Sequence, residues 1–276
     1  MQERVRAHRL GWFFGLTFAL SWSYWVPVAL AGGSWSHVPG LLGPFAAAVV
    51  VTGLADGRAG LAGLARRAAR WRVAPRWYLA AVVLVAASAA GVAVEAALDG
   101  APSLRALGTM PGLPAIGWLG TFGLVLVLNG YGEEVGWRGV AWPELRDRYG
   151  PSRAATVLAA PWALWHLPTF WIDSGLRGFP LPLLPGWLIG LAAGAFVLGW
   201  LHDRTGGSLF VVALWHAVLN MASATEGTEG WPAALVTATV IALAFGIGRH
   251  EEHASAGTAS DRYGAPPCPD PSPTTS

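Results

Sequence analysis

The sequence predicts an all-α protein, a polytopic transmembrane helical bundle of about eight spans with both termini in the cytosol. Three features of the 276-residue chain predict this fold: its composition, its long uncharged runs and its one-sided distribution of arginine. Hydrophobic residues make up 54% of the chain and charged residues only 12%, about half of the charged share of a typical soluble domain. The chain also has 16 Trp residues, a type that gathers at membrane–water interfaces. Most soluble folds are therefore excluded.

Eight apolar segments are expected to cross the membrane. Runs such as Trp77–Leu98 and Pro232–Gly248 carry almost no charge, and their length is close to the roughly 20 apolar residues that span a bilayer as helix. In chain order the expected spans are residues 10–31, 38–55, 77–98, 114–132, 154–171, 186–201, 208–222 and 231–248.

The arginine distribution supports both this count and the orientation. All 18 basic residues are Arg. With the N-terminus in the cytosol, every one of them except Arg105 and Arg177 falls in a cytosolic segment, as the positive-inside rule requires. We therefore expect a multi-pass protein of the plasma (inner) membrane.

The domain organisation is expected to be simple. Residues 1–250 form one transmembrane domain, and 251–276 form a disordered cytosolic tail, because the tail is rich in Ser, Thr, Pro and Asp and such a composition buries too little apolar surface to fold. Residues 56–76 contain six Arg. They are either an amphipathic helix on anionic lipid or a solvated connector.

Ionisable residues within the apolar segments are the candidates for function, because placing each one in a membrane is costly. Glu134 and Arg138 lie four residues apart, so on a helix they share a face and can pair. Glu133 points about 100° away, toward a different neighbour. A structural ion pair at a helix end explains this group equally well when it is taken alone.

Two further groups lie on later segments. His166 follows Pro161-Trp162-Ala163-Leu164-Trp165, and taken alone it is more typical of a satisfied core histidine. His216 and Asn220 lie four residues apart on one helix face, where a helix–helix hydrogen bond is the plainer interpretation. All three groups lie toward the expected cytosolic half. Together they would satisfy one another most simply in one shared cavity, which would have the parts for hydrolysis.

The ordered set of motifs resembles the CPBP family of intramembrane proteases, which includes type II CAAX prenyl endopeptidases and bacterial relatives linked to bacteriocin processing and self-immunity. The similarity covers residues 129–220. One position departs from the family, which usually has Phe four residues before the second-motif His; here it is Trp162, which keeps an aromatic wall. The motif residues are Glu133, Glu134 and Arg138; Trp162 and His166; His216 and Asn220.

The resemblance implies a role for each motif residue. Glu133 and His166 would polarise the attacking water, while His216 and Asn220 would hold the developing oxyanion. The activity would be that of an endopeptidase cutting near the cytosolic face. Its substrate would be a prenylated C-terminus, a leader peptide or a segment of a membrane protein.

The resemblance leaves the cofactor open. Glu134 and Arg138 would pair to fix the helix that carries Glu133. A competing view of the family makes Glu133, His166 and His216 the ligands of one zinc ion, and three such ligands plus water are an ordinary catalytic zinc site.

Two other functions use the same polar residues. One is a non-hydrolytic, proton-coupled transporter in which the carboxylates and imidazoles relay protons. The other is an immunity or scaffold protein that binds a partner without cutting it. The expected partners are the lipid bilayer and a peptide or membrane-protein substrate, with no nucleic acid.

Overall fold

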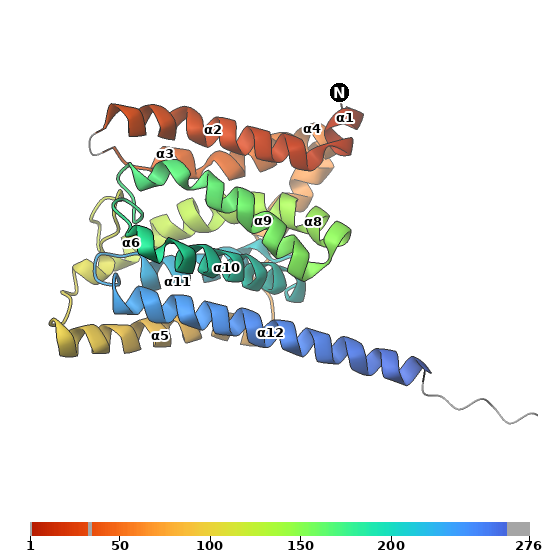
Figure 1. Ribbon diagram of the computed structural model, residues 1–276. Helices are drawn as coiled ribbons and strands as arrows, with labels where there is room; N and C mark the ends of the chain where they lie inside the picture. Colours follow the sequence, from red (N-terminus) through yellow and green to blue (C-terminus); the bar gives the residue numbers. More distant parts are fainter. Residues whose placement is uncertain (1, 33–34, 264–276) are drawn as a thin grey trace, which may run out of the picture.

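The computed structural model describes residues 2–32 and 35–263, and within these ranges the chain is a bundle of helices (Figure 1). The only β-pairing in the described part is an isolated bridge between Ser36 and Asp173. The all-α prediction is confirmed. The long helices are α2 (Arg9–Ala31), α4 (Gly43–Ala68), α5 (Arg76–Leu98), α9 (Pro151–Trp165), α10 (Leu184–Arg204), α11 (Leu209–Ser223) and α12 (Trp231–Tyr263). The shorter ones are α1 (Gln2–Ala7), α3 (Val38–Leu41), α6 (Trp118–Val125), α7 (Gly132–Gly136) and α8 (Trp142–Tyr149), with 3₁₀ turns η1 (Ala106–Gly108), η4 (Leu167–Phe170) and η5 (Leu181–Leu183) and π-helical segments η2 (Leu126–Tyr131) and η3 (Trp137–Ala141).

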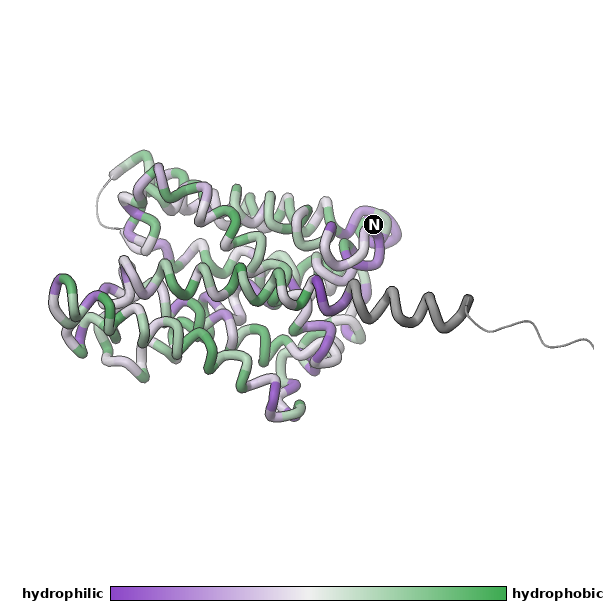
Figure 2. Tube along the Cα trace, turned by 60° about the horizontal axis from the view of Figure 1, so that its bottom comes forward, coloured by the Kyte–Doolittle hydropathy of each residue, from purple (hydrophilic) through white to green (hydrophobic). Residues whose placement is uncertain are grey.

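Five helices of the described chain are long and apolar enough to cross a membrane: Arg9–Ala31, Val38–Ala68, Arg76–Leu98, Leu181–Arg204 and Trp231–Glu251. Leu209–Ser223 is a shorter apolar helix. Figure 2 shows hydrophobic residues along the middle of the bundle and hydrophilic ones gathered toward its ends, including the end that holds the N-terminus. The protein is therefore a multi-pass membrane protein.

Each of the eight expected spans coincides with a helix or with an unbroken run of consecutive helical segments, here called a rod, although the boundaries differ. The fourth begins at Trp118 rather than 114 and continues through η2, α7, η3 and α8 to Tyr149. The fifth ends at Trp165 rather than 171, because Pro168 disfavours the α conformation of the residue before it, Leu167. The count of eight membrane crossings stays a prediction.

Two rods are longer than expected. Helix α4 continues to Ala68 across a break at Gly57, whose φ of 61° and ψ of −152° suit only glycine. Part of the arginine-rich segment 56–76 is thus helical. Helix α12 continues to Tyr263, past the expected start of the tail at residue 251, since this stretch contains several Ala residues that favour helix. The rest of the expected tail, 264–276, lies outside the described residues.

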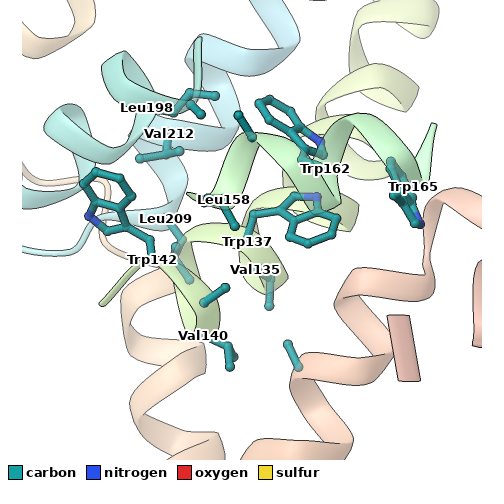
Figure 3. Packing of buried hydrophobic residues seen from close by; sticks show 14 of the residues in the cluster. Val135, Trp137, Val140, Trp142, Leu158, Trp162, Trp165, Leu198, Leu209 and Val212 are labelled. Atoms are coloured by element: carbon teal, nitrogen blue, oxygen red, sulfur yellow. The ribbon is translucent and has the colours of Figure 1, made fainter. Parts of the chain in front are cut away.

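The core of the bundle is rich in tryptophan, which the interfacial preference of this residue does not anticipate. The ring of Trp165 packs against Trp25 at 4.7 Å and against Trp137 at 5.8 Å between ring centroids. These contacts join α9 to α2 and to η3, and Figure 3 shows Trp137, Trp162 and Trp165 near one another. The fully buried tryptophans are Trp25, Trp137, Trp142, Trp165 and Trp215, whereas Trp12, Trp35, Trp71, Trp118, Trp171 and Trp231 are about half exposed.

Candidate active site

The two adjacent glutamates lie on α7, a short helix held between two π-helical segments, η2 and η3. π-Helical turns are rare and frequently occur at functional sites. Glycines let neighbouring helices approach this segment closely. A Cβ atom at Gly130 would lie 2.7 Å from the carbonyl oxygen of Ala213 on α11, and one at Gly136 would lie 2.7 Å from that of Pro44 on α4. The backbone that carries the glutamates is therefore wedged between α4 and α11.

Glu134 is the centre of a buried charged network. Its Oε1 atom accepts a hydrogen bond from Nη1 of Arg138 at 2.9 Å, and Nδ1 of His216 lies 2.7 Å from the same oxygen. Glu134 and Arg138 are fully buried and His216 is 4% exposed. The predicted pairing of Glu134 with Arg138 is confirmed by the structure. The contact to His216 also joins the first and third motifs directly.

Glu133 faces a different neighbour, as its position one residue earlier on the helix predicts. Its Oε2 atom accepts a hydrogen bond from the indole N–H of Trp162 at 2.8 Å. The same indole ring lies beneath the guanidinium of Arg138, 4.5 Å from the ring centroid, which is cation–π geometry. Trp162 on α9 therefore connects Glu133 with the network around Glu134.

His166 follows α9 directly, and its ring orientation is determined by the helix. Its Nδ1 atom lies 2.8 Å from the carbonyl oxygen of Trp162. A carbonyl can only accept, so Nδ1 carries the proton and the neutral ring leaves Nε2 as an acceptor. This end of α9 is fastened to α2, because the indole N–H of Trp165 donates to Oγ of Ser21 at 2.8 Å and that of Trp22 donates to the carbonyl of Trp165 at 3.1 Å.

Asn220 lies one turn after His216 on α11 and is partly exposed, as is His166. Glu133, in contrast, is 1% exposed. The acidic side of the cluster is thus buried and His166 is more open, while Asn220 is placed only by its position one turn from His216. The rings of His166 and His216 both lie near Trp162, at 6.0 and 5.8 Å between ring centroids.

The helix bounds give the position of each site residue along its own helix. Glu133 and His216 lie near the middle of their rods, and His166 lies at the end of α9 that is far from Pro151. In the predicted orientation the Pro151 end is cytosolic. The placement of the cluster in the cytosolic half of the membrane stays a prediction.

The alternative of a zinc ion bound by Glu133, His166 and His216 does not fit this arrangement. Among the residues that the structure describes, no three His, Cys, Asp or Glu side chains are grouped so that they could hold a metal ion. Nδ1 of His216 instead contacts Glu134, and one oxygen of Glu133 is taken by Trp162. We therefore derive no chemical step through a metal.

Trp162 is a member of the site that the sequence identifies only as an aromatic wall. It donates a hydrogen bond to Glu133, and the Arg138 guanidinium lies over its ring. A signal for this role is present in the sequence, because a buried indole N–H needs an acceptor and a carboxylate on a neighbouring span is the strongest one available.

The fold and the site together define a class: an all-helical, multi-pass membrane protein with carboxylates, imidazoles and a guanidinium buried in one cluster. The model of the type II CAAX prenyl endopeptidase Rce1-like family matches residues 115–222. CAAX prenyl protease 2 of Methanococcus maripaludis is 25% identical to this chain over an alignment of 109 positions, and the alignment covers 35% of this chain and 37% of that relative. The chain thus matches well under half of that protein.

The matched segment contains every residue of the three motifs. Residues 115–222 are accordingly similar to the Rce1-like family, and this similarity supports the resemblance to the CPBP family that the motifs indicate.

Proposed function

We propose that this protein is an intramembrane endopeptidase that hydrolyses a peptide bond with water activated by Glu133 and His166. One observation carries the proposal: four side chains of the three motifs (Glu133, Arg138, His166 and His216) lie around the single indole of Trp162, and Glu134 is joined to them through Arg138 and His216. Buried carboxylates and imidazoles placed together are the groups that general acid–base hydrolysis needs.

The attack on the peptide bond uses the two groups that can accept a proton. Glu133 has one oxygen held by Trp162, so the other is available to a water molecule. Nε2 of His166 is an acceptor when Nδ1 donates to the Trp162 carbonyl. As the water oxygen bonds to the carbonyl carbon of the peptide, the water proton passes to one of these two acceptors, Glu133 or His166. The proton then passes to the leaving amine when the C–N bond breaks.

The developing oxyanion would be held by His216 and Asn220. Because Nδ1 of His216 contacts the Glu134 carboxylate, its Nε2 atom is left for the substrate, and a protonated ring presents an N–H there. The amide of Asn220 supplies a second N–H from the next turn of α11. Donors aimed at an oxyanion in a water-poor site contribute strongly to catalysis.

The substrate class follows from where the cluster lies. A peptide that reaches residues at the middle of a membrane bundle must itself be membrane-associated, so the substrate is a membrane-bound protein or a peptide held at the bilayer. The expected location is the plasma (inner) membrane. The CAAX prenyl protease named among the relatives makes a lipid-modified C-terminus one candidate, beside a leader peptide or a membrane-protein segment.

The test is terminal-peptide proteomics on membranes that contain the parent protein or the Glu133→Gln variant at matched expression. New protein ends that are present with the parent and absent with the variant support the proposal and identify the substrate. Glu144→Gln is the matched control, since Glu144 lies on the same rod but makes only a 3.7 Å ion pair with Arg9.

The opposite outcome would be equally informative. Identical protein ends with parent and Glu133→Gln, with both proteins folded in the membrane, would contradict the proposal. If the Glu133→Gln cells also kept their phenotype, an immunity or scaffold role would replace the peptidase. Proton-coupled uptake that collapses with the pH gradient would favour a transporter.

A further inference from the structure

We propose that Trp162 is a positioning residue of the catalytic cluster, whose indole N–H holds the Glu133 carboxylate so that one oxygen faces the attacking water. This inference rests on the proposed function. It concerns a position where the chain departs from the phenylalanine usual in the family, and that phenylalanine has no group that could make this bond.

The contact is direct and specific. The indole nitrogen lies 2.8 Å from Oε2 of Glu133, which is a normal length for a hydrogen bond from N–H to a carboxylate. Both side chains are buried, with Trp162 4% and Glu133 1% exposed. Within the described part of the chain, no other hydrogen bond to the Glu133 carboxylate is found. Its orientation therefore depends on the indole.

The indole ring of Trp162 is itself held by more than one contact. Its face supports the Arg138 guanidinium at 4.5 Å, and Arg138 is bonded to Glu134. Its edge approaches the ring of His216, at 5.8 Å between centroids and an interplanar angle of 83°. These contacts restrict rotation of the ring and so favour one direction of the N–H bond.

The backbone of the same residue positions the second proposed base. The carbonyl oxygen of Trp162 contacts Nδ1 of His166 at 2.8 Å. One residue thus orients Glu133 through its side chain and His166 through its backbone. A phenylalanine at 162 would keep the second contact and lose the first, so the two effects can be separated by substitution.

The consequence for catalysis has two parts. A hydrogen-bond donor stabilises the ionised carboxylate, which is the form that accepts a proton. The donor also occupies one oxygen and leaves the other for water. Loss of the N–H should therefore reduce kcat more than it changes KM, because substrate binding does not involve this bond.

The experiment compares Trp162→Phe with the parent, using the purified full-length protein in lipid nanodiscs and a substrate identified as above. We expect kcat to fall about 10- to 100-fold, the range for losing one hydrogen bond to a charged group, with KM changed less than threefold. We also expect the acidic limb of the pH profile of kcat/KM to move to higher pH, because the ionised carboxylate loses a hydrogen-bond donor.

Trp142→Phe is the matched control. Trp142 is fully buried, and its indole N–H also donates to a carboxylate oxygen, that of Asp203, at 3.1 Å. Because Asp203 is outside the cluster, this variant should lose stability to a similar extent without a shift of the pH profile. A purely structural role of Trp162 would give the same result for both variants.

A second variant keeps the test decisive if Trp162→Phe folds poorly. Replacement of Trp162 by 3-benzothienylalanine retains the shape of the ring and substitutes sulfur for the N–H group. Parent-like kcat and an unshifted pH profile in this variant would overturn the inference. If the parent cleaves peptides while both variants are parent-like, only the positioning role fails; if the parent itself lacks peptidase activity, the proposed function fails.

Discussion

The buried ion pair between Glu134 and Arg138 allows a quantitative test of the site's architecture. The change is Arg138→Met, which removes the charge and keeps much of the side-chain volume in a flexible, apolar form. In the parent, Nη1 of Arg138 lies 2.9 Å from Oε1 of Glu134, and neither side chain is exposed. The variant leaves the Glu134 carboxylate buried with His216 as its remaining polar contact.

The expected cost can be estimated from this geometry. At 2.9 Å, a pair of unit charges attracts by about 6 kcal/mol with an effective dielectric constant of about 20. Removing one member of a buried pair typically destabilises a protein by about 3–5 kcal/mol. His216 can still share the charge of Glu134, so we expect a loss of about 3 kcal/mol, which corresponds to a Tm lower by roughly 10 °C.

The assay is thermal unfolding of the parent and the variant in the same detergent micelles. The double variant Glu134→Leu/Arg138→Met completes the cycle and should recover a large part of the loss, because no unpaired charge is then buried. Two results would refute the view that these charges depend on each other. One is an Arg138→Met variant whose free energy of unfolding is within about 1 kcal/mol of the parent. The other is a double variant that loses the summed stability costs of the two single substitutions.

Three further results are expected. Asn220→Ala should lower kcat by about 10²–10³-fold, the usual effect of losing an oxyanion donor, with unchanged thermal stability; parent-like kcat would remove Asn220 from the site. A tight zinc chelator should leave the cleavage rate within twofold, since the cluster offers no three-ligand metal set among the described residues, and loss of activity that zinc restores would contradict this. Gly136→Ala should lower the free energy of unfolding by about 1–3 kcal/mol, because the new Cβ would lie 2.7 Å from the carbonyl oxygen of Pro44; unfolding in denaturant measures it, and an unchanged midpoint would show that α4 can move aside.

A fourth concerns pH. Burial lowers the pKa of His37, which lies just before the second span, although its contact with the Asp173 carbonyl opposes this. The folded state thus favours the neutral ring and the unfolded state binds the proton more readily, so stability should be lost as the pH falls below the ordinary value of 6.5. Unfolding midpoints measured from pH 8 to 5 for the parent and His37→Gln would test this; the same acid sensitivity in both would exclude His37 as the cause.

The sequence predicts the helical class and the location of each rod well, because both depend on apolar length and on arginine distribution. The pairing of Glu134 with Arg138 is also predictable, since it is a local i, i+4 contact within one helix. Even the divergence of the two adjacent glutamates follows from helix geometry. These features depend on chain periodicity alone.

The contacts between rods are less accessible to such reasoning. The bond between Glu134 and His216 joins residues 82 positions apart, and the bond between Trp162 and Glu133 joins residues 29 apart. Both depend on how α7, α9 and α11 pack. That packing depends on glycines, and the periodicity of the sequence does not identify which helix each glycine contacts. The end of α9 also differs from the prediction, because the apolar character of the chain continues beyond Trp165 while the helix does not.

The two π-helical segments beside α7 have a mechanical consequence. In a continuous α-helix, a twist imposed at one end is transmitted along the hydrogen-bond ladder to the other. Here η2 and η3 change the spacing of that ladder from i→i+4 to i→i+5 on both sides of the five residues Gly132–Gly136. Each change shifts the angular register of the helix, so the direction in which the two glutamates point depends on both π-helical segments and on the helices α4 and α11 that pack against them.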